Sequence, residues 1–420
     1  MSETTRTEDE PKHMRWRSHA AVLALGTFAV GTDAFVIAGL LPDISDSLHV
    51  SVGAAGQLVS VFSMAYALLS PVLAALTSTW SRRTVLITAL LIFALGNGVT
   101  ALAPDYGAVL AARIVAAAGA ALFTPNAGVT AASLAGPRQR GRAIAIVTVG
   151  LTSSLALGAP LGTLIGNALG WQATMWFVTA LALPVIPVLA LRLPAVAHDS
   201  VAGLRQRLTP LTDRKVAGVL AGTLLAFVGI YLPYTYISEV FRSATGGDGA
   251  RVALLLLVFG LAGTVGNLLA GRLADRLGPR TVVLAATLAL TAVFLLVVGS
   301  PASFPVAMVL VALSGTASWS VTAPQQQRLI SLAPAGAESV VVSLNAAVMY
   351  LAISVSSVLG AALLDASSPG HLSAVAAGFT LVAAAVTALS GRPGRRMPPA
   401  SPHAGQPPTT GGETEKARAC

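Results

Sequence analysis

Charge and cysteine are both scarce in this chain, and each scarcity excludes a class of protein. Only 10% of its 420 residues are charged, whereas 55% are hydrophobic and the mean hydropathy is +0.76. Soluble globular chains carry about a quarter charged residues, so we expect a protein that lies mainly in lipid and not a soluble enzyme. Cys420 is the single cysteine and the last residue, so we expect no intramolecular disulfide and no C-terminal prenylation.

Motifs for nucleotide and metal binding are also missing. No P-loop pattern G-x-x-x-x-G-K-[ST] occurs, so we do not expect ATP as the direct energy source. The six histidines are scattered without metal-ligand spacing. The net charge of +9 is spread over short interruptions between apolar runs and is not gathered on one phosphate-binding face. We therefore expect no cofactor, no metal, no nucleic-acid partner and no enzymatic activity.

Long apolar runs are abundant. A helix that crosses about 30 Å of hydrocarbon needs roughly 20 apolar residues. The run after the first 18 residues is too long for a signal-peptide core, and many more runs follow it, so we expect it to be retained as a span. The alternation of a β-barrel strand is not seen. Twelve spans are predicted, at residues 19–41, 54–77, 84–103, 107–133, 143–168, 173–193, 216–238, 252–270, 281–300, 305–327, 339–364 and 373–390.

Basic residues predict the orientation of these spans. Of the 26 Lys and Arg residues, 23 fall in the tails and in alternate loops on one side of the predicted membrane. The opposite loops hold only Arg242 and Arg251, and Arg113 lies within a span. Because positive charge is retained in the cytoplasm, both termini are predicted to be cytoplasmic.

The chain divides into two similar halves. "GRLADRLGPRT" (271–281) follows the eighth span and "AALTSTWSRRT" (74–84) follows the second, so that Arg280 matches Arg83. Such a repeat is typical of transporters. The predicted organisation is an N-terminal tail (1–18), a six-helix half (19–193), a cytoplasmic connector (194–215), a second six-helix half (216–390) and a disordered cytoplasmic tail (391–420).

Four stretches resemble signatures of the major facilitator superfamily. "GRLADRLGPR" (271–280) resembles its cytoplasmic-loop signature, and "GLTSSLALGAPLG" (150–162) resembles the signature of its drug:proton antiporters. "ARIVAAAGAA" (112–121) keeps the membrane arginine of a third signature without its usual Gln-Gly. "GTDAFVIAGLLPDISDSLHVSVGAAG" (31–56) is similar to the first span and loop of bacterial twelve-span efflux proteins of the chloramphenicol-resistance and arabinose-efflux type. The resemblance implies an all-α membrane protein with twelve helices in two halves.

The loop signature is expected to form a gate on the cytoplasmic side. Its glycines allow a tight turn, and Asp275 at a helix end can face an arginine or the positive N-terminus of a neighbouring helix. The alternative is plain topogenic charge with a turn. The first copy has Ser78 where the signature has Asp, and Glu338 is a candidate to supply that negative charge. The gate residues are Gly271, Asp275, Arg276, Gly278, Arg280, Arg82, Arg83 and Arg142, the last of which Asp275 should approach when the cavity opens outward.

The fifth span combines a glycine face with a proline. Gly150, Gly158, Gly162 and Gly166 line one face of a helix, which lets two helices approach closely. Pro160 removes a backbone donor and should bend the span. The resemblance implies that this antiporter motif, Gly150, Gly158, Pro160 and Gly162, seals the centre against leak, and the alternative is ordinary small-residue packing.

Two charges lie inside spans at one depth. Asp33 lies about 12 Å and Arg113 about 9 Å from the outer membrane surface at 1.5 Å per residue. Each buried charge costs at least about 2.5–3.5 kcal/mol, so both should face the protein interior, paired or hydrated. We expect Asp33 to carry a proton and Arg113 to hold and tune it. The alternative is a purely structural ion pair.

Other polar residues in spans are candidates for the wall of a substrate cavity. Tyrosine also lies at membrane interfaces, and a glutamine at a helix end needs no function, so each has a structural alternative. The candidates are Asn97, Tyr231, Tyr234, Tyr236, Gln325 and Asn345.

The sequence thus predicts a monomeric proton-coupled antiporter of the bacterial cytoplasmic membrane. It would export a small, lipophilic, neutral or cationic organic compound, such as a drug or antibiotic. The alternatives are a sugar or nucleoside exporter with the same coupling, a receptor or scaffold without transport, and a passive channel.

Overall fold

The computed structural model describes residues 10–136, 139–194, 212–299, 303–333, 338–366 and 369–390. Most of the predicted tails and of the connector lies outside the described residues. Within them, twelve helices are long and apolar enough to cross a membrane. The predicted all-α class and the number of spans are therefore confirmed.

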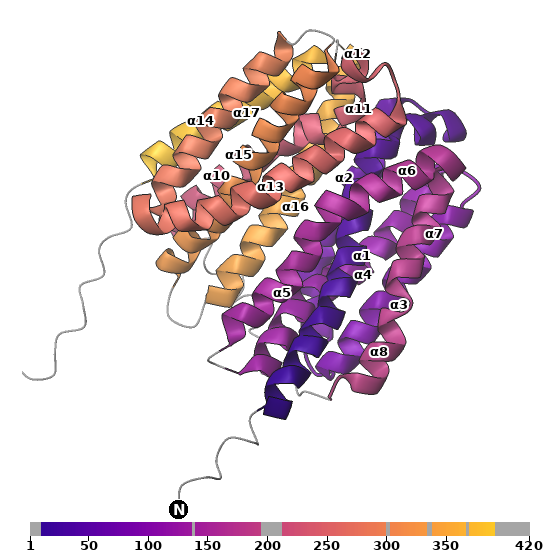
Figure 1. Ribbon diagram of the computed structural model, residues 1–420, viewed down its shortest axis with the longest axis vertical. Helices are drawn as coiled ribbons and strands as arrows, with labels where there is room; N and C mark the ends of the chain where they lie inside the picture. Colours follow the sequence, from indigo (N-terminus) through magenta and orange to yellow (C-terminus); the bar gives the residue numbers. More distant parts are fainter. Residues whose placement is uncertain are drawn as a thin grey trace, which may run out of the picture.

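The helices form two groups that lie side by side (Figure 1). The first group contains α1 (Glu10–Leu48), α2 (Val52–Leu76), α3 (Arg82–Leu102), α4 (Tyr106–Ala135), α5 (Arg140–Ser153), the π-helix η1 (Ser154–Gly158), α6 (Ala159–Leu169), α7 (Trp171–Ala182) and α8 (Val185–Arg192). The second group contains α10 (Arg214–Thr235), α11 (Ile237–Val240), α12 (Arg242–Thr245), α13 (Gly249–Leu277), α14 (Pro279–Val298), α15 (Phe304–Leu332), α16 (Glu338–Ala366) and α17 (Gly370–Leu389).

Local sequence signals explain where several helices begin and end. Ser51, Ser81 and Asp105 each accept a hydrogen bond from the backbone N–H three residues ahead, which satisfies an orphan donor at a helix start. Gly278, with φ of 85°, ends α13, and Pro279 begins α14. The expected tight turn is therefore formed by Gly278, whereas Gly271 lies inside α13.

Several helices outlast the apolar runs that predicted them. α1 continues through Pro42 to Leu48, and α13 continues to Leu277. Hydropathy falls where a helix leaves the lipid, but the backbone hydrogen bonds continue in the polar layer, so apolar length underestimates helix length.

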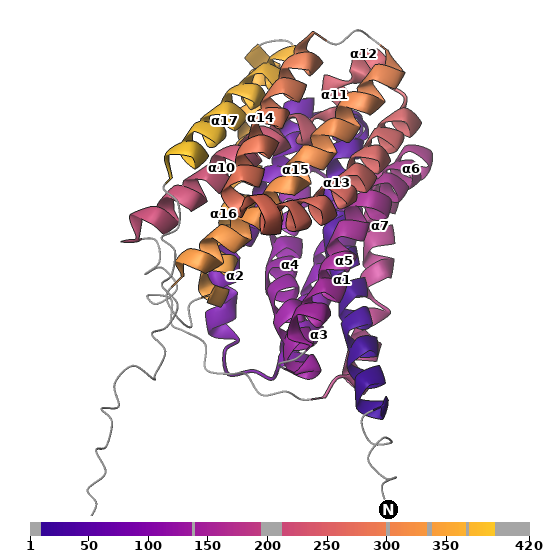
Figure 2. The ribbon, with the colours of Figure 1, turned by 60° about the vertical axis from the view of Figure 1, so that its left-hand side comes forward.

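The two ends of the bundle carry opposite charge. We call the end at which α1 begins the basic end; it carries Arg83, Arg140, Arg142, Arg272 and Arg276. We call the other the acidic end, because Asp43, Asp46, Glu239, Asp248 and Asp365 lie there. In Figure 2, α1 begins at the bottom and α12 lies at the top, so the basic end is below and the acidic end above.

The two halves touch from the middle of the bundle to the acidic end. Ser60 Oγ lies 2.9 Å from Ser354 Oγ, and Ser357 Oγ donates to Gly56 O at 2.6 Å. Tyr66 stacks on Tyr350 with ring centroids 3.6 Å apart. All six residues belong to α2 or α16, which therefore form one of the seams between the halves.

Candidate functional site

Asp33 and Arg113 form an ion pair in the interior of the first half. Arg113 Nη1 on α4 donates to Asp33 Oδ1 on α1 at 2.5 Å. The side chains are 0% and 1% exposed, respectively. The structure thus brings together the two intramembrane charges that the sequence locates at one depth.

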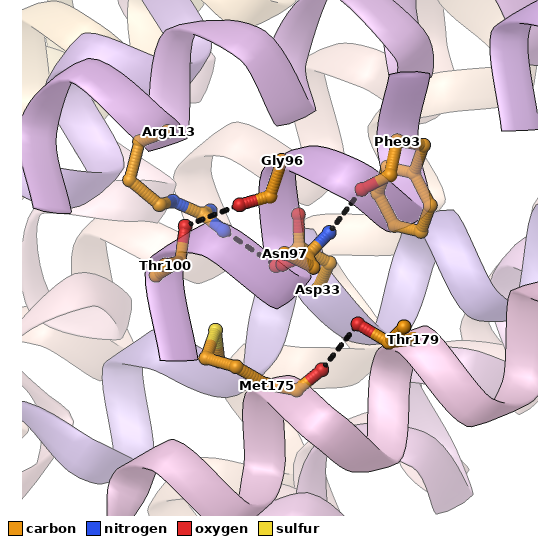
Figure 3. A network of polar contacts seen from close by, with 8 residues as sticks. All are labelled: Asp33, Phe93, Gly96, Asn97, Thr100, Arg113, Met175 and Thr179. Atoms are coloured by element: carbon orange, nitrogen blue, oxygen red, sulfur yellow. Dashed lines mark hydrogen bonds and ion pairs between the residues drawn. The ribbon is translucent and has the colours of Figure 1, made fainter. Parts of the chain in front are cut away.

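Asn97, drawn in Figure 3, and Phe62 are neighbours of the ion pair. The amide of Asn97 on α3 lies beside the carboxyl of Asp33 and donates to Phe93 O at 3.1 Å. The ring of Phe62 lies 4.4 Å from Arg113 Cζ, at cation–π distance. Asn97 therefore lies beside the ion pair, whereas the sequence predicts that it lines a substrate cavity.

The pair is only partly satisfied by hydrogen bonds. Asp33 Oδ2 and Arg113 Nε are buried and have no hydrogen-bond partner in the described structure. Buried polar groups are normally paired, and an unpaired one is costly, most of all when it is charged. Protonation at Oδ2 would remove the charge from the carboxyl group. The arrangement is thus chemically able to gain and lose a proton.

An aromatic cluster of α10 and α13 lies against α1. Tyr234 Oη donates to Phe35 O at 3.4 Å, and Phe35 is two residues from Asp33 on the same helix. Tyr231 and Tyr234 meet edge to face at 5.6 Å, and Tyr234 lies 4.9 Å from Phe259. These rings, with Phe227, Leu155 and Trp319, line a cavity of about 10 Å³, which is about enough for one water molecule.

Of the three tyrosines that the sequence indicates for a substrate pocket, Tyr231 and Tyr234 line the aromatic cavity, whereas Tyr236 Oη donates to Ser357 O at 2.7 Å. Tyr66 and Tyr350, which stack between the halves, were not among the sequence candidates. Each of them is a single tyrosine deep within an otherwise apolar span, and this sequence pattern could have indicated both as candidates. Their contact could not be predicted, because 284 positions separate them along the chain.

The glycine face of the fifth span packs against α1 of its own half. A methyl group added at Gly158 would lie 2.0 Å from Thr32 Oγ1, and one added at Gly150 would lie 2.1 Å from Ala24 O. Gly162 faces Val36 in the same way, at 2.6 Å. The seam between α1 and the fifth span is therefore too close for any side chain at these positions.

The other half meets the fifth span at its π-helical turn. A methyl group at Gly260 of α13 would lie 2.6 Å from Leu155 O and 2.5 Å from Ala156 Cα. The π-helix forms directly before Pro160, where Ala159 N–H donates to Ser154 O. Proline has no N–H and its ring displaces the preceding turn, which explains a local widening of the helix. The sequence predicts a bend here, but not its π-helical form.

The proposed gate residues do not form one cluster in this conformation. Asp275 and Arg142 are exposed, and Asp275 makes no ion pair with a described residue. Arg280 instead donates to the backbone carbonyls of Thr387 and Ala388 at the end of α17. Basic side chains stabilise helix C-termini in this way, so Arg280 has a role within its own half. Arg82 is buried and Arg83 half-buried at the start of α3.

Gln325 and Asn345 lie inside the second half and do not line the aromatic cavity. Gln325 Nε2 donates to Thr223 Oγ1 at 3.2 Å, and Thr223 donates to Asn345 Oδ1 at 3.0 Å. Arg328 Nη1 donates to Gln325 Oε1 at 2.8 Å. The expectation that these two amides line a substrate cavity therefore differs from the structure, because each is used in a buried network that links α10, α15 and α16.

Two six-helix halves that meet at an aromatic cavity, with a buried ion pair inside the first half, define a multi-pass membrane transporter. The sequence matches the profile of the Major Facilitator Superfamily twice, over residues 23–239 and 219–415. The chain belongs to the major facilitator superfamily.

Relatives within the family include an uncharacterized transporter and a protein named for chloramphenicol resistance. The chain is 35% identical to the "Uncharacterized MFS-type transporter YbcL" of Bacillus subtilis, over 86% of this chain and 93% of that protein. It is 35% identical to the "Chloramphenicol resistance protein" of Streptomyces lividans, over 61% of this chain and 66% of that protein.

Solved structures share the fold at low sequence identity. A bacterial homologue of the human lysosomal transporter Spinster, in an inward-facing and unoccupied conformation, superimposes with a TM-score of 0.70 at 18% identity, over 89% of this chain and 97% of that one. The nucleoside transporter NupG (D323A mutant) gives a TM-score of 0.74 at 11% identity, over 90% and 100%. At these sequence identities, the two comparisons show that the fold is shared and nothing further.

Proposed function

We propose that this transporter is a proton-coupled antiporter that exports a small organic compound across the bacterial cytoplasmic membrane. The observation that carries the proposal is the buried pair of Asp33 and Arg113, in which one carboxylate oxygen has no partner. An ionisable group deep in a membrane span is costly and is typical of proton and substrate pathways. A purely structural ion pair is the alternative, and it predicts that transport does not depend on the protonation of Asp33.

The proposed cycle alternates the protonation of Asp33. Burial favours the neutral carboxyl group, whereas the guanidinium of Arg113 favours the ionised one, so a change in cavity access can shift the balance. Facing outward, Asp33 takes a proton and substrate leaves. Facing inward, Asp33 releases the proton and the site accepts substrate again. As Asp33 is the only acid deep in a span, we expect about one proton per substrate.

We assign the basic end to the cytoplasm and the present conformation to the inward-facing state. The contacts between the halves at the acidic end would then close the outer side, and the exposed Asp275 would belong to an open cytoplasmic gate. In the outward-facing state, Asp275 should approach Arg142. The closed seam between α2 and α16 supports this assignment.

Epitope tags test this orientation. Tags at positions 5, 205 and 400 should be reached only after the membrane is permeabilised, because the excess of arginine keeps that side in the cytoplasm. A tag inserted after Gly247 should be reached on intact cells. Labelling of any of the first three tags on intact cells would contradict the assignment.

The substrate is proposed to be a neutral or singly cationic aromatic or lipophilic compound. The aromatic cavity, which contacts α1 through the hydrogen bond from Tyr234 to Phe35 O, is lined mainly by the rings of Phe227, Tyr231, Tyr234, Phe259 and Trp319. Such walls bind flat apolar rings and cations better than anions, which Asp33 would repel when ionised. The Streptomyces relative is named for chloramphenicol, which makes chloramphenicol the first compound to test. A sugar or nucleoside remains the alternative substrate class.

Accumulation of a compound panel in an efflux-deficient host tests the function. We expect cells with the transporter to hold less of at least one aromatic compound than control cells, and a protonophore to remove the difference. Panels of sugars and nucleosides test the alternative. Efflux that persists at full rate with the protonophore would exclude proton coupling, and equilibration without accumulation would indicate a passive channel.

A further inference from the structure

A second, larger cavity lies between the two halves at the acidic end. Its volume is about 650 Å³. α1 and α6 of the first half form one wall, and α11, α12 and the start of α13 form the other. We call it the acidic vestibule, after the side chains of Asp43, Asp46, Glu239 and Asp248 that line it.

Negative charge exceeds positive charge around the acidic vestibule. Arg242 lies 3.4 Å from Glu239, but its side chain is 70% exposed whereas that of Glu239 is 10% exposed. Arg251 lies 3.7 Å from Asp248, and both are about half exposed. Asp43 and Asp46, on one face of α1, make no ion pair with a described residue. Walls of low dielectric focus such a field and favour a cation inside the cavity.

Buried polar atoms in the same walls lack partners. Ser238 is 5% exposed, lines the cavity and has no hydrogen-bond partner for Oγ in the described structure. Asp43 Oδ2 is likewise buried and unpaired. Because buried polar atoms are normally satisfied, these two point to a bound group that donates hydrogen bonds or carries positive charge.

Packed side chains of α1, α6 and α13 lie between the acidic vestibule and the aromatic cavity. A methyl group at Gly39 would lie 2.2 Å from Thr163 Oγ1 and 2.9 Å from Leu256 Cδ1, so these side chains close on one another. Val252 lines the vestibule and Phe259 lines the aromatic cavity, and seven residues of α13 correspond to about 10 Å. Movement of α13 away from α1 would join the two cavities.

We propose that the acidic vestibule is a binding site for a drug-sized organic monocation. Its volume falls in the range of about 300–1,000 Å³ that small-molecule sites occupy. No group of three or more metal-ligating side chains occurs among the described residues, which disfavours a metal ion. Its use as a release subsite for the exported compound rests on the proposed function, whereas the binding site itself does not.

A reporter cysteine tests the field in the acidic vestibule. Ala168 lines the cavity and is exposed, so Ala168→Cys in a Cys420→Ser background offers one thiol to small reagents. A cationic methanethiosulfonate should react about tenfold faster than an anionic one, because the local field attracts cations. In Asp43→Asn/Asp46→Asn the ratio should fall severalfold, whereas Asp365→Asn, which removes an exposed acid outside the cavity, should leave it unchanged.

Binding to the purified protein tests the ligand class. Ethidium, a permanent cation with amino groups, should protect the Ala168→Cys thiol, and neutral chloramphenicol should not. Asp43→Asn/Asp46→Asn should weaken ethidium binding about tenfold and Ser238→Ala about threefold, with a normal elution profile in both. Equal rates for the two reagents, or unchanged ethidium affinity in the double variant, would overturn the proposal. Neither measurement uses a proton gradient, so each is independent of any failure of proton coupling.

Discussion

Replacement of Asp33 by asparagine is expected to reduce proton-driven transport in proteoliposomes to the level of protein-free liposomes. Asparagine keeps the size of the side chain and removes its titration, so the cycle can no longer exchange one proton for substrate. Substrate exchange at equal pH, which needs no net proton movement, should survive. Asp33→Glu should retain partial activity with an altered pH optimum. The measurement is uptake of the exported compound driven by an imposed pH difference.

Folding must be separated from coupling in this experiment. Asp33→Asn leaves the buried Arg113 without its counter-charge, and breaking a buried pair costs about 3–5 kcal/mol. The double variant Asp33→Asn/Arg113→Gln removes both charges and should recover stability but not proton-driven transport. Asp365→Asn serves as the exposed control. Concentrative transport by Asp33→Asn under a pH difference alone would show that the proton site is elsewhere.

Gly158→Ala is expected to impair transport strongly, although the substitution adds only one methyl group. The new methyl group would lie 2.0 Å from Thr32 Oγ1, on the residue next to Asp33, so either the Thr32 side chain must turn or α1 and the π-helical turn must separate. Overpacking of this kind costs about 1–3 kcal/mol. We expect proton-driven transport to fall and leak without substrate to rise, as measured by proton flux into proteoliposomes.

Two matched variants locate this effect. Gly141 lies in α5 of the same span with no atom within 4 Å of an added methyl group, so Gly141→Ala should leave transport unchanged. Thr32→Ala removes the colliding oxygen, so Gly158→Ala/Thr32→Ala should recover part of the activity. If Gly158→Ala has normal transport and leak, the glycine face of the fifth span is dispensable for coupling.

Much of the site was accessible from the sequence because its signals are local. A carboxylate and a guanidinium inside apolar spans can be recognised from the sequence, because a charged side chain in lipid is energetically costly and therefore rare. Counting residues from the span ends gave both the same depth, and the structure has them in contact at 2.5 Å. Gly278 could likewise be assigned to a turn, since a positive φ favours glycine.

Other parts of the site follow from which helix faces meet. Gln325 and Asn345 are polar residues within spans, as expected for the wall of a cavity. Their partners lie more than 100 positions away along the chain: Gln325 donates to Val219 O and Thr223 Oγ1, and Thr223 donates to Asn345 Oδ1. These distant contacts place both amides in a closed hydrogen-bond network. Arg280 resembled a gate residue, and its contact with the end of α17 was not visible in its own loop.

By itself, the sequence determined the solvent of this protein, the number of its spans and the depth of its intramembrane charges, because hydropathy and charge act residue by residue along the chain. Only the tertiary structure decided that the glycines of the fifth span face α1 and that Gly260 meets the π-helical turn. It also gathered acids from three separate segments around the acidic vestibule. Packing between residues that are distant along the chain decides which face of a helix is covered. A local sequence pattern therefore does not predict which of several small or polar faces will contact a neighbouring helix.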